Sequence, residues 1–155
     1  MRPRFTTLQA LTRCDRIKVI AENADMADKQ ISIWGIHGGR TGDANALFLE
    51  HKYVALGWPN MGDLSELEAT RDAFKVSIAD RYPNTKPGAI PVAAGMLFRF
   101  LYEVKTGDLV AYPSKSDRRI HIGRVDGDYE HDTSLLPAYP NRRRVSWLRA
   151  DPRTR

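Results

Sequence analysis

Short β-prone runs and stretches of helical periodicity alternate along this chain. Short apolar runs bounded by turn residues predict strands at residues 30–36, 53–58, 109–112, 120–125 and 143–148. In the fourth run, strict alternation places side chains on two faces: Ile120, Ile122 and Arg124 on one, and His121, Gly123 and Val125 on the other. A glycine between branched residues indicates a bulge or the close approach of another group to the backbone.

The sequence predicts a short helix that follows Asp43 and runs through Leu47 to Glu50, and longer helices over residues 65–81 and 90–104. We expect Asp43 to cap the short helix, and Ser65 with Glu68 forms a possible capping box for the next one. Pro91 suits the first turn of the last helix, because the amide missing there has no helical partner in any case.

Strands separated by a few helices, with the densest β-structure late in the chain, favour an α+β fold containing a small barrel or curled sheet. A chain of 155 residues fits one domain with a substantial core. The apolar positions of residues 1–25 fit neither the helical nor the strand period. Met26 would make a natural first residue for the protein. We therefore divide the chain into an N-terminal extension of doubtful role (residues 1–25) and one domain (residues 26–155).

Charge adds a hint of function. The formal net charge is +5, and the basic residues concentrate in two places: the run Arg142, Arg143 and Arg144, and the loop that carries Lys115, Arg118 and Arg119. Clustered arginine suggests that the partner is a polyanion such as nucleic acid, although a solubilising basic end would look the same.

No apolar run approaches the roughly 20 residues of a membrane span. Cys14 is the single cysteine, so a reducing cytoplasm fits.

Enzymatic functions find little support in the residue pattern. The four histidines lack metal-ligand spacing, and one cysteine cannot build a zinc site. Glu103 and Lys105 match half of a nuclease motif, but they end a predicted helix where that motif needs a strand. We expect no cofactor, no metal and no catalytic residue in this chain.

The order of several short motifs resembles a known module. They are Trp34-Gly-Ile, Leu56-Gly-Trp58, Gly107-Asp-Leu-Val-Ala-Tyr-Pro-Ser114, His121-Ile-Gly-Arg-Val125, Tyr139-Pro-Asn and Val145-Ser-Trp147. Together they resemble the N-terminal PUA-like, EVE-related domain of Mrr-type, modification-dependent restriction endonucleases, over about residues 29–155. The resemblance implies a PUA-like (EVE-type) small β-barrel flanked by helices. It also implies the specificity domain of a restriction system, which reads DNA carrying a modified base. On this resemblance the chain is either a reader domain with a catalytic nuclease domain beyond Arg155 or a stand-alone reader.

A pocket for a flipped base needs an aromatic face, polar groups for the base edge and cations for the flanking phosphates. Our candidates for the base pocket are Trp34, Gly35, His37, Trp58, Tyr112, Pro113, Ser114 and His121. Our candidates for phosphate binding are Arg40, Lys115, Arg118, Arg119, Arg142, Arg143 and Arg144. Each tryptophan could instead be a core residue, Ser114 a turn cap and His121 a structural residue. Together with these residues, the resemblance implies a non-catalytic reader of modified, cytosine-derived DNA bases. An RNA-binding PUA-like protein and a small-molecule or protein-interaction domain are the alternatives.

Overall fold

The computed structural model describes residues 30–148, and from Ser32 onward these residues belong to one compact unit. Its elements, in chain order, are β1 (Ile33–Gly35), α3 (Asn45–Leu49), β2 (Tyr53–Leu56), α4 (Arg71–Arg81), α5 (Ile90–Tyr102), β3 (Leu109–Pro113), β4 (Ile120–His131) and β5 (Asn141–Trp147). Short 3-10 turns lie at Pro59–Met61, Leu64–Glu66 and Pro87–Ala89. The predicted N-terminal extension and Cys14 lie outside the described residues.

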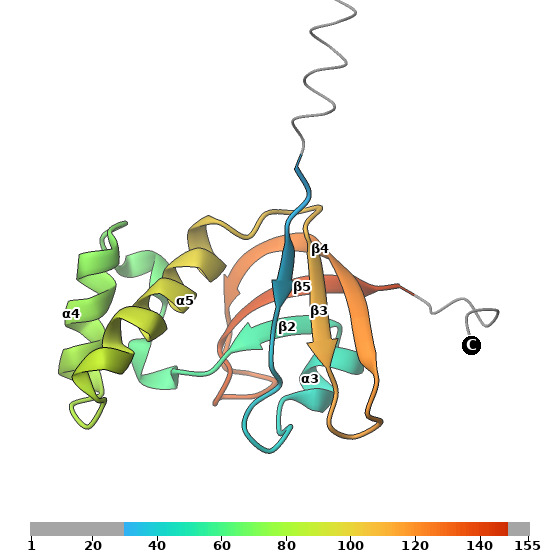
Figure 1. The fold of residues 1–155 in the computed structure, drawn as a ribbon, viewed down its shortest axis with the longest axis horizontal. Helices are drawn as coiled ribbons and strands as arrows, with labels where there is room; N and C mark the ends of the chain where they lie inside the picture. The colour runs from blue at the N-terminus through green and yellow to red at the C-terminus, as the bar shows by residue number, and fades with distance from the viewer. Residues whose placement is uncertain (1–29, 149–155) are drawn as a thin grey trace, which may run out of the picture. The chain divides into compact units, whose positions relative to one another are not determined.

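The five strands form one mixed sheet in the order β1-β3-β4-β5-β2 (Figure 1). Strand β1 pairs with β3 in parallel, and the other neighbours are antiparallel. The sheet curls into a half-barrel, and β1 and β2 are its two edges. The predicted α+β fold with a small curled sheet flanked by helices is therefore confirmed. Within residues 30–148, no helix is both long enough and apolar enough to cross a membrane.

The inner face of the sheet carries the core, as the alternation in residues 120–125 predicts. Val110, Tyr112, Val125 and Val145 are almost fully buried, whereas Ile120 is 69% exposed. Gly123 lies opposite Trp147 in the β4–β5 pairing. A Cβ atom at Gly123 would overlap Val145 Cγ1 and lie 2.8 Å from the Trp147 ring. The close approach that the sequence predicted for this glycine is thus confirmed.

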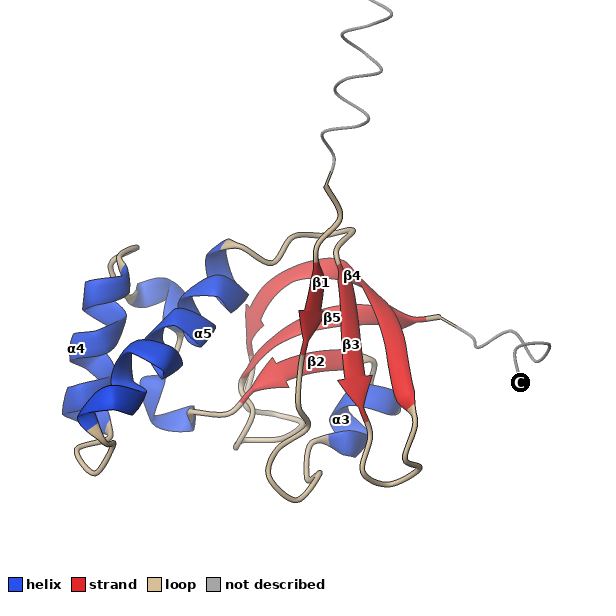
Figure 2. Ribbon diagram, viewed as in Figure 1, coloured by secondary structure: helices blue, strands red, loops and turns tan. Residues whose placement is uncertain are grey.

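Helices pack on the sheet at two places (Figure 2). In α3, Phe48 meets Tyr112 edge-on at 4.9 Å, and its carbonyl accepts a hydrogen bond from Trp147 Nε1 at 2.7 Å. Helix α5 ends against β5, because the buried Arg143 donates to the carbonyls of Phe100 at 3.0 Å and Leu101 at 2.8 Å. A cation that binds the last carbonyls of a helix also complements the helix dipole. Arg143 therefore holds α5 on the sheet.

Two predicted helix caps are wrong. The helix expected from Ser65 begins only at Arg71, where Thr70 Oγ1 accepts a hydrogen bond from the Ala73 amide at 3.2 Å. Ser65 lies in a separate 3-10 turn and donates to Asp63, so it does not form a capping box with Glu68. Asp43 makes no cap for α3 and instead accepts a hydrogen bond from Tyr139 at 3.1 Å. The Asp43 carboxylate thus binds the hydroxyl of Tyr139, which is distant in the chain, and not a main-chain amide of the neighbouring helix.

Strand lengths also differ from the pattern in the sequence. Strands β1 and β2 are shorter than expected, and β4 continues past Val125, where the predicted strand ends, through Asp126-Gly127-Asp128 to His131. The pairing with β5 shifts register between Val125 and Tyr129, as a bulge does. Beyond it, the Tyr129 hydroxyl accepts a hydrogen bond from the Leu64 amide at 2.9 Å. Because of the bulge, β4 continues through its polar residues and pairs with β5 again beyond them.

Replacing Gly123 by Ala is expected to destabilise the unit by about 1–3 kcal/mol, the usual cost of overpacking a filled core. Gly35→Ala is the matched control on the same sheet, because a Cβ atom there meets nothing within 4 Å. Urea unfolding of both variants measures the difference. Equal stability of the two would show that Trp147 does not pack across Gly123 in solution.

Candidate functional site

A cavity of about 950 Å³ lies between the two edge strands of the half-barrel. Strands β1, β2 and β3 and helix α5 line it, together with the loop after β1, Lys115 and Tyr139. Its body is apolar, with these side chains at the wall: Ile36, Val54, Leu56, Met96, Phe100, Val104 and Val110. Such a volume and lining are typical of small-molecule sites, which span about 300–1,000 Å³. We call it the seam cavity.

Trp34 is the anchored aromatic wall of the seam cavity. It lies on β1 opposite Val110 and is half-buried. Its indole Nε1 donates to Oδ2 of the buried Asp108 at 2.9 Å, and the same oxygen accepts the Lys105 amide at 3.0 Å. A ring held by a buried carboxylate cannot turn freely. Its remaining surface is therefore a fixed platform on which a planar group could stack.

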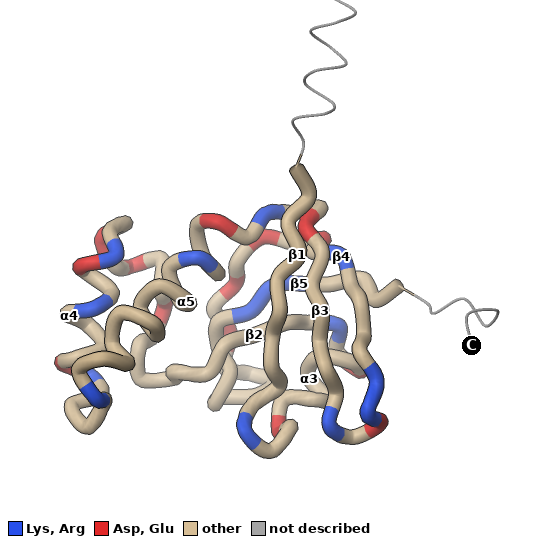
Figure 3. Tube along the Cα trace, in the orientation of Figure 1, with Lys and Arg blue, Asp and Glu red and all other residues tan. Residues whose placement is uncertain are grey.

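Two neighbouring loops form the cationic rim. Arg40 lies in the loop after β1 and Lys115 in the β3–β4 loop, and both residues line the seam cavity. Lys115 Nζ donates to the Arg40 carbonyl, so the two loops are tied together. Figure 3 shows basic positions on both loops. The rim therefore presents positive charge at the entrance to an apolar space.

The loop after β1 is shaped by Gly39, whose φ is +86°. A Cβ atom there would overlap the Asp43 carboxylate and the Tyr139 hydroxyl, which are hydrogen-bonded to each other. Burial raises the pKa of Tyr139, and its bond to Asp43 raises it further. The Tyr139 hydroxyl therefore stays protonated and donates to Asp43, which ties the loop after β1 to the segment that precedes β5.

Arg99 adds a third cation from α5. It is the only charged residue in that helix, and its nearest acidic partner is Glu103 at 3.9 Å. Among the described residues that line the seam cavity, none is Asp or Glu. The site therefore combines an apolar body with positive charge from two directions, a combination that suits an anionic ligand with a flat apolar part.

The structure brings together five of the residues that the sequence singled out: Trp34, Gly35, His37, Arg40 and Lys115 all line the seam cavity. Arg118 and Arg119 lie on the same β3–β4 loop, exposed and outside the lining. Arg118 has a positive φ of 58°. These two arginines add positive charge on the loop that carries Lys115, but they do not line the seam cavity.

Four other candidates lie behind or beside the seam cavity. The buried Tyr112 donates to Asn45 Oδ1 at 2.9 Å, and Ser114 donates to the same oxygen at 3.0 Å. Burial raises the pKa of Tyr112. His121 contacts Asp117 at 2.8 Å, and Pro113 is exposed at the end of β3. None of these four residues lines the seam cavity.

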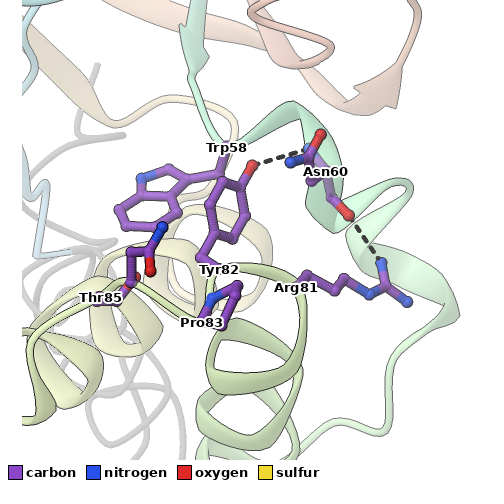
Figure 4. Close-up of a pocket in the computed structure, with 7 residues that line it drawn as sticks. Trp58, Asn60, Arg81, Tyr82, Pro83 and Thr85 are labelled. Carbon is purple, nitrogen blue, oxygen red and sulfur yellow. Dashed lines mark hydrogen bonds between the residues drawn. The ribbon is translucent and has the colours of Figure 1, made fainter.

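Trp58 lines a second, smaller pocket of about 470 Å³ next to α4 (Figure 4). It has a left-handed backbone with a φ of 68° and meets Tyr82 edge-on at 4.9 Å. The Tyr82 hydroxyl accepts the Asn60 amide at 2.8 Å. Trp34 and Trp58 line different pockets, so they cannot enclose one base together.

The arginine run of β5 divides between the two faces of the sheet. Arg143 points inward to α5, as described above. Arg142 is buried, pairs with Asp132 at 2.8 Å and Glu130 at 3.3 Å, and stacks on the Tyr53 ring at 4.2 Å. Arg144 is exposed and donates to the Tyr53 hydroxyl at 3.1 Å. Arg142 and Arg143 thus have partners within the domain, and we no longer assign them to phosphate.

Sequence reasoning missed Arg99, Met96, Phe100 and Val104 of the α5 side, and also Asp108 and Tyr139. Arg99 carried a usable signal, since it is a single charge inside an otherwise apolar helix. Asp108 and Tyr139 stood in the motifs that carry the resemblance, but nothing local marked them as an anchor and a rim residue. Their roles depend on contacts with Trp34 and Asp43, which are distant in the chain.

These features define a small α+β domain with an apolar, cation-rimmed cavity in the open side of its sheet. The chain belongs to the family described as a domain of unknown function (DUF8426), which matches residues 34–155. Neither the curated proteins nor the solved structures contain a match to this chain.

Proposed function

We propose that this domain is a non-catalytic DNA-binding module that takes one flipped, modified base, derived from cytosine, into the seam cavity. The observation that carries the proposal is the make-up of the cavity. It offers an apolar body, an anchored indole and three cations, without a carboxylate among its described lining residues. A nucleotide has the matching parts, a flat base and charged phosphates.

Stacking supports a base as the occupant. Enzymes and readers that act on a base out of the duplex hold it against aromatic or apolar side chains. Stacking on an aromatic ring is worth about 1–3 kcal/mol per base. Trp34 can supply such a surface, because Asp108 already fixes its orientation before any ligand binds. The apolar wall made by Val54, Leu56 and Val110 would accept the added carbon of a cytosine modification.

The rim supports a polymer rather than a free nucleotide. Arg40 and Lys115 approach the seam cavity from the loops, and Arg99 approaches it from α5. Arg118 and Arg119 extend the positive surface along the β3–β4 loop. A nucleotide that leaves a strand keeps a phosphate on each side of its sugar, so cations around the entrance and beyond it would hold the flanking backbone.

The resemblance of the motif order to the PUA-like, EVE-related domain of modification-dependent restriction endonucleases supports the same proposal. Such a module supplies specificity, and a nuclease domain, beyond Arg155 or on another chain, would supply cleavage. The curled α+β sheet is compatible with that resemblance. An RNA-binding function remains the second candidate, because the same cavity and rim would suit an unpaired base in RNA.

Removing the two rim cations should weaken binding to every duplex and reduce its salt dependence. For Arg40→Ala combined with Lys115→Ala, we expect the slope of log K against log salt to fall by roughly two units, because about one counterion is released per phosphate contact. Lys75→Ala combined with Lys86→Ala is the charge-matched control, since neither residue lines the seam cavity. Fluorescence anisotropy at several salt concentrations measures the slope. An unchanged slope in the rim variant would place DNA elsewhere.

Removing the indole ring of Trp34 should weaken binding only to DNA that carries the modified base. Trp34→Ala is expected to weaken binding to the preferred modified duplex about ten- to a hundredfold, while affinity for the unmodified duplex barely moves. Trp34→Phe keeps a ring but loses the bond to Asp108, so it should fall between wild type and Trp34→Ala. Trp58→Ala is the control, because Trp58 lines the other pocket.

The measurement is a competition titration on matched duplexes with cytosine, 5-methylcytosine or 5-hydroxymethylcytosine, after each variant is shown to fold. Equal losses on all three duplexes would mean that Trp34 does not contact the base. Tighter binding of structured RNA than of any of these duplexes would favour the second candidate.

A further inference from the structure

The side chains around the seam cavity leave few hydrogen-bonding groups for the polar edge of a base. Trp34 Nε1 is bound to Asp108, and the Tyr139 hydroxyl is bound to Asp43. The other polar side chains of the lining are three cations and His37. The cations can donate but cannot accept. A base edge carries both donors and acceptors, so most of its partners must come from the main chain.

Strand β1 offers such groups, because it is an edge strand. The Ser32 carbonyl accepts from the Leu109 amide at 2.9 Å, and the Ile36 amide donates to the Ala111 carbonyl at 3.0 Å. Ser32, Trp34 and Ile36 therefore turn their main-chain groups toward β3. By alternation, the N–H and C=O groups of Ile33 and Gly35 point to the open edge.

Strand β2 is the opposite edge of the sheet, and every second residue of it likewise turns its main-chain groups to the open side. The Val145 amide donates to the Lys52 carbonyl at 2.9 Å, and the register pairs Val54 with Arg143. Hydrogen-bonded residues in an antiparallel pair recur at every second position. Lys52, Val54 and Leu56 therefore face β5, and the main-chain groups of Tyr53 and Ala55 face away from it. Gly57 continues this alternation just after the strand.

Only some of these free groups reach the seam cavity. Gly35, Ala55 and Gly57 line it, whereas Ile33 and Tyr53 do not. The two glycines have no side chain and can contribute only main-chain atoms. The side chain of Ala55 belongs to the outer face of the sheet, since Ala55 lies opposite Arg142. All three residues thus present main chain to the cavity.

We propose that the main-chain N–H and C=O groups of Gly35, Ala55 and Gly57 read the polar edge of the bound base. This inference rests on the proposed function and adds its recognition chemistry. The ligand part that fits is a planar ring with amide-like donors and acceptors in its plane, as on the Watson–Crick edge of a pyrimidine. Trp34 would contact the face of the ring while the two strand edges contact its rim.

Ile33 and Tyr53 provide internal controls for this proposal. Their main-chain groups are free in the same sense as those of Gly35 and Ala55, on the same strands, but outside the cavity. A peptide strand that added to either edge would use them as well. A base in the seam cavity would reach only the three residues that line it.

The test is an amide-resolved NMR titration of the full ¹⁵N-labelled chain with short duplexes that contain one central cytosine, 5-methylcytosine or 5-hydroxymethylcytosine. We expect the amide resonances of Gly35, Ala55 and Gly57 to shift on binding of the preferred modified duplex, and those of Ile33 and Tyr53 to stay in place. The unmodified duplex should shift the rim loops without shifting these three amides.

A pair of variants tests the same point by affinity. Gly35→Pro removes one N–H from the open edge without removing a bond between strands, and Ile33→Pro does the same outside the cavity. Gly35→Pro should reduce the preference for the modified duplex roughly three- to tenfold, the effect of one lost hydrogen bond, and Ile33→Pro should leave it unchanged.

The two proposals fail in different ways. If the wild-type chain prefers a modified duplex but the three amides do not shift, or if Ile33 and Tyr53 shift equally, the main-chain readout is wrong and the proposed function stands. If the wild-type chain shows no preference among the duplexes, the proposed function fails, and the readout that rests on it fails too.

Discussion

The sheet of this domain does not close, and that constraint leaves a cavity between its two edge strands. Five strands leave β1 and β2 without an outer neighbour, so two rows of main-chain groups face the opening between them. Helix α5 covers part of the opening, and the buried Arg143 holds its last turn on β5 through two carbonyls. Apolar side chains of α5 and the strands then surround a space rather than filling it. The seam cavity thus exists because the half-barrel is open between β1 and β2 and α5 is held beside the opening.

The charged residues divide between holding the fold and facing solvent at the rim. Burial lowers the pKa of Arg143, because desolvation disfavours its charged guanidinium. Arg142 is neutralised by Glu130 and Asp132. Arg40 and Lys115, in contrast, lie exposed at the cavity entrance. In the site that we propose, the run of three arginines therefore contributes less than the two cations on separate loops.

Local signals predicted most of the architecture. The alternation in residues 120–125 identified the inner face correctly, including the close contact at Gly123, and the apolar spacing after Ile90 identified α5. Errors arose where distant partners decided the outcome. Asp43 binds Tyr139 in place of a helix amide, and the polar Asp126-Gly127-Asp128 stretch stays in β4 through a bulge. Fewer than a third of the residues that line the seam cavity were among the sequence candidates. Trp34, Arg40 and Lys115 adjoin recognisable strand ends, whereas Arg99 and Asp108 acquire their roles only through tertiary packing.

The central claim is that the seam cavity holds a base that has left its duplex. A crystal structure of the domain with a duplex containing one modified cytosine tests that claim most directly. Our account predicts that the modified base lies in the seam cavity with its ring on Trp34 and its neighbouring phosphates near Arg40 and Lys115. A modified base that stays stacked in the duplex, with the seam cavity free of DNA, would contradict it.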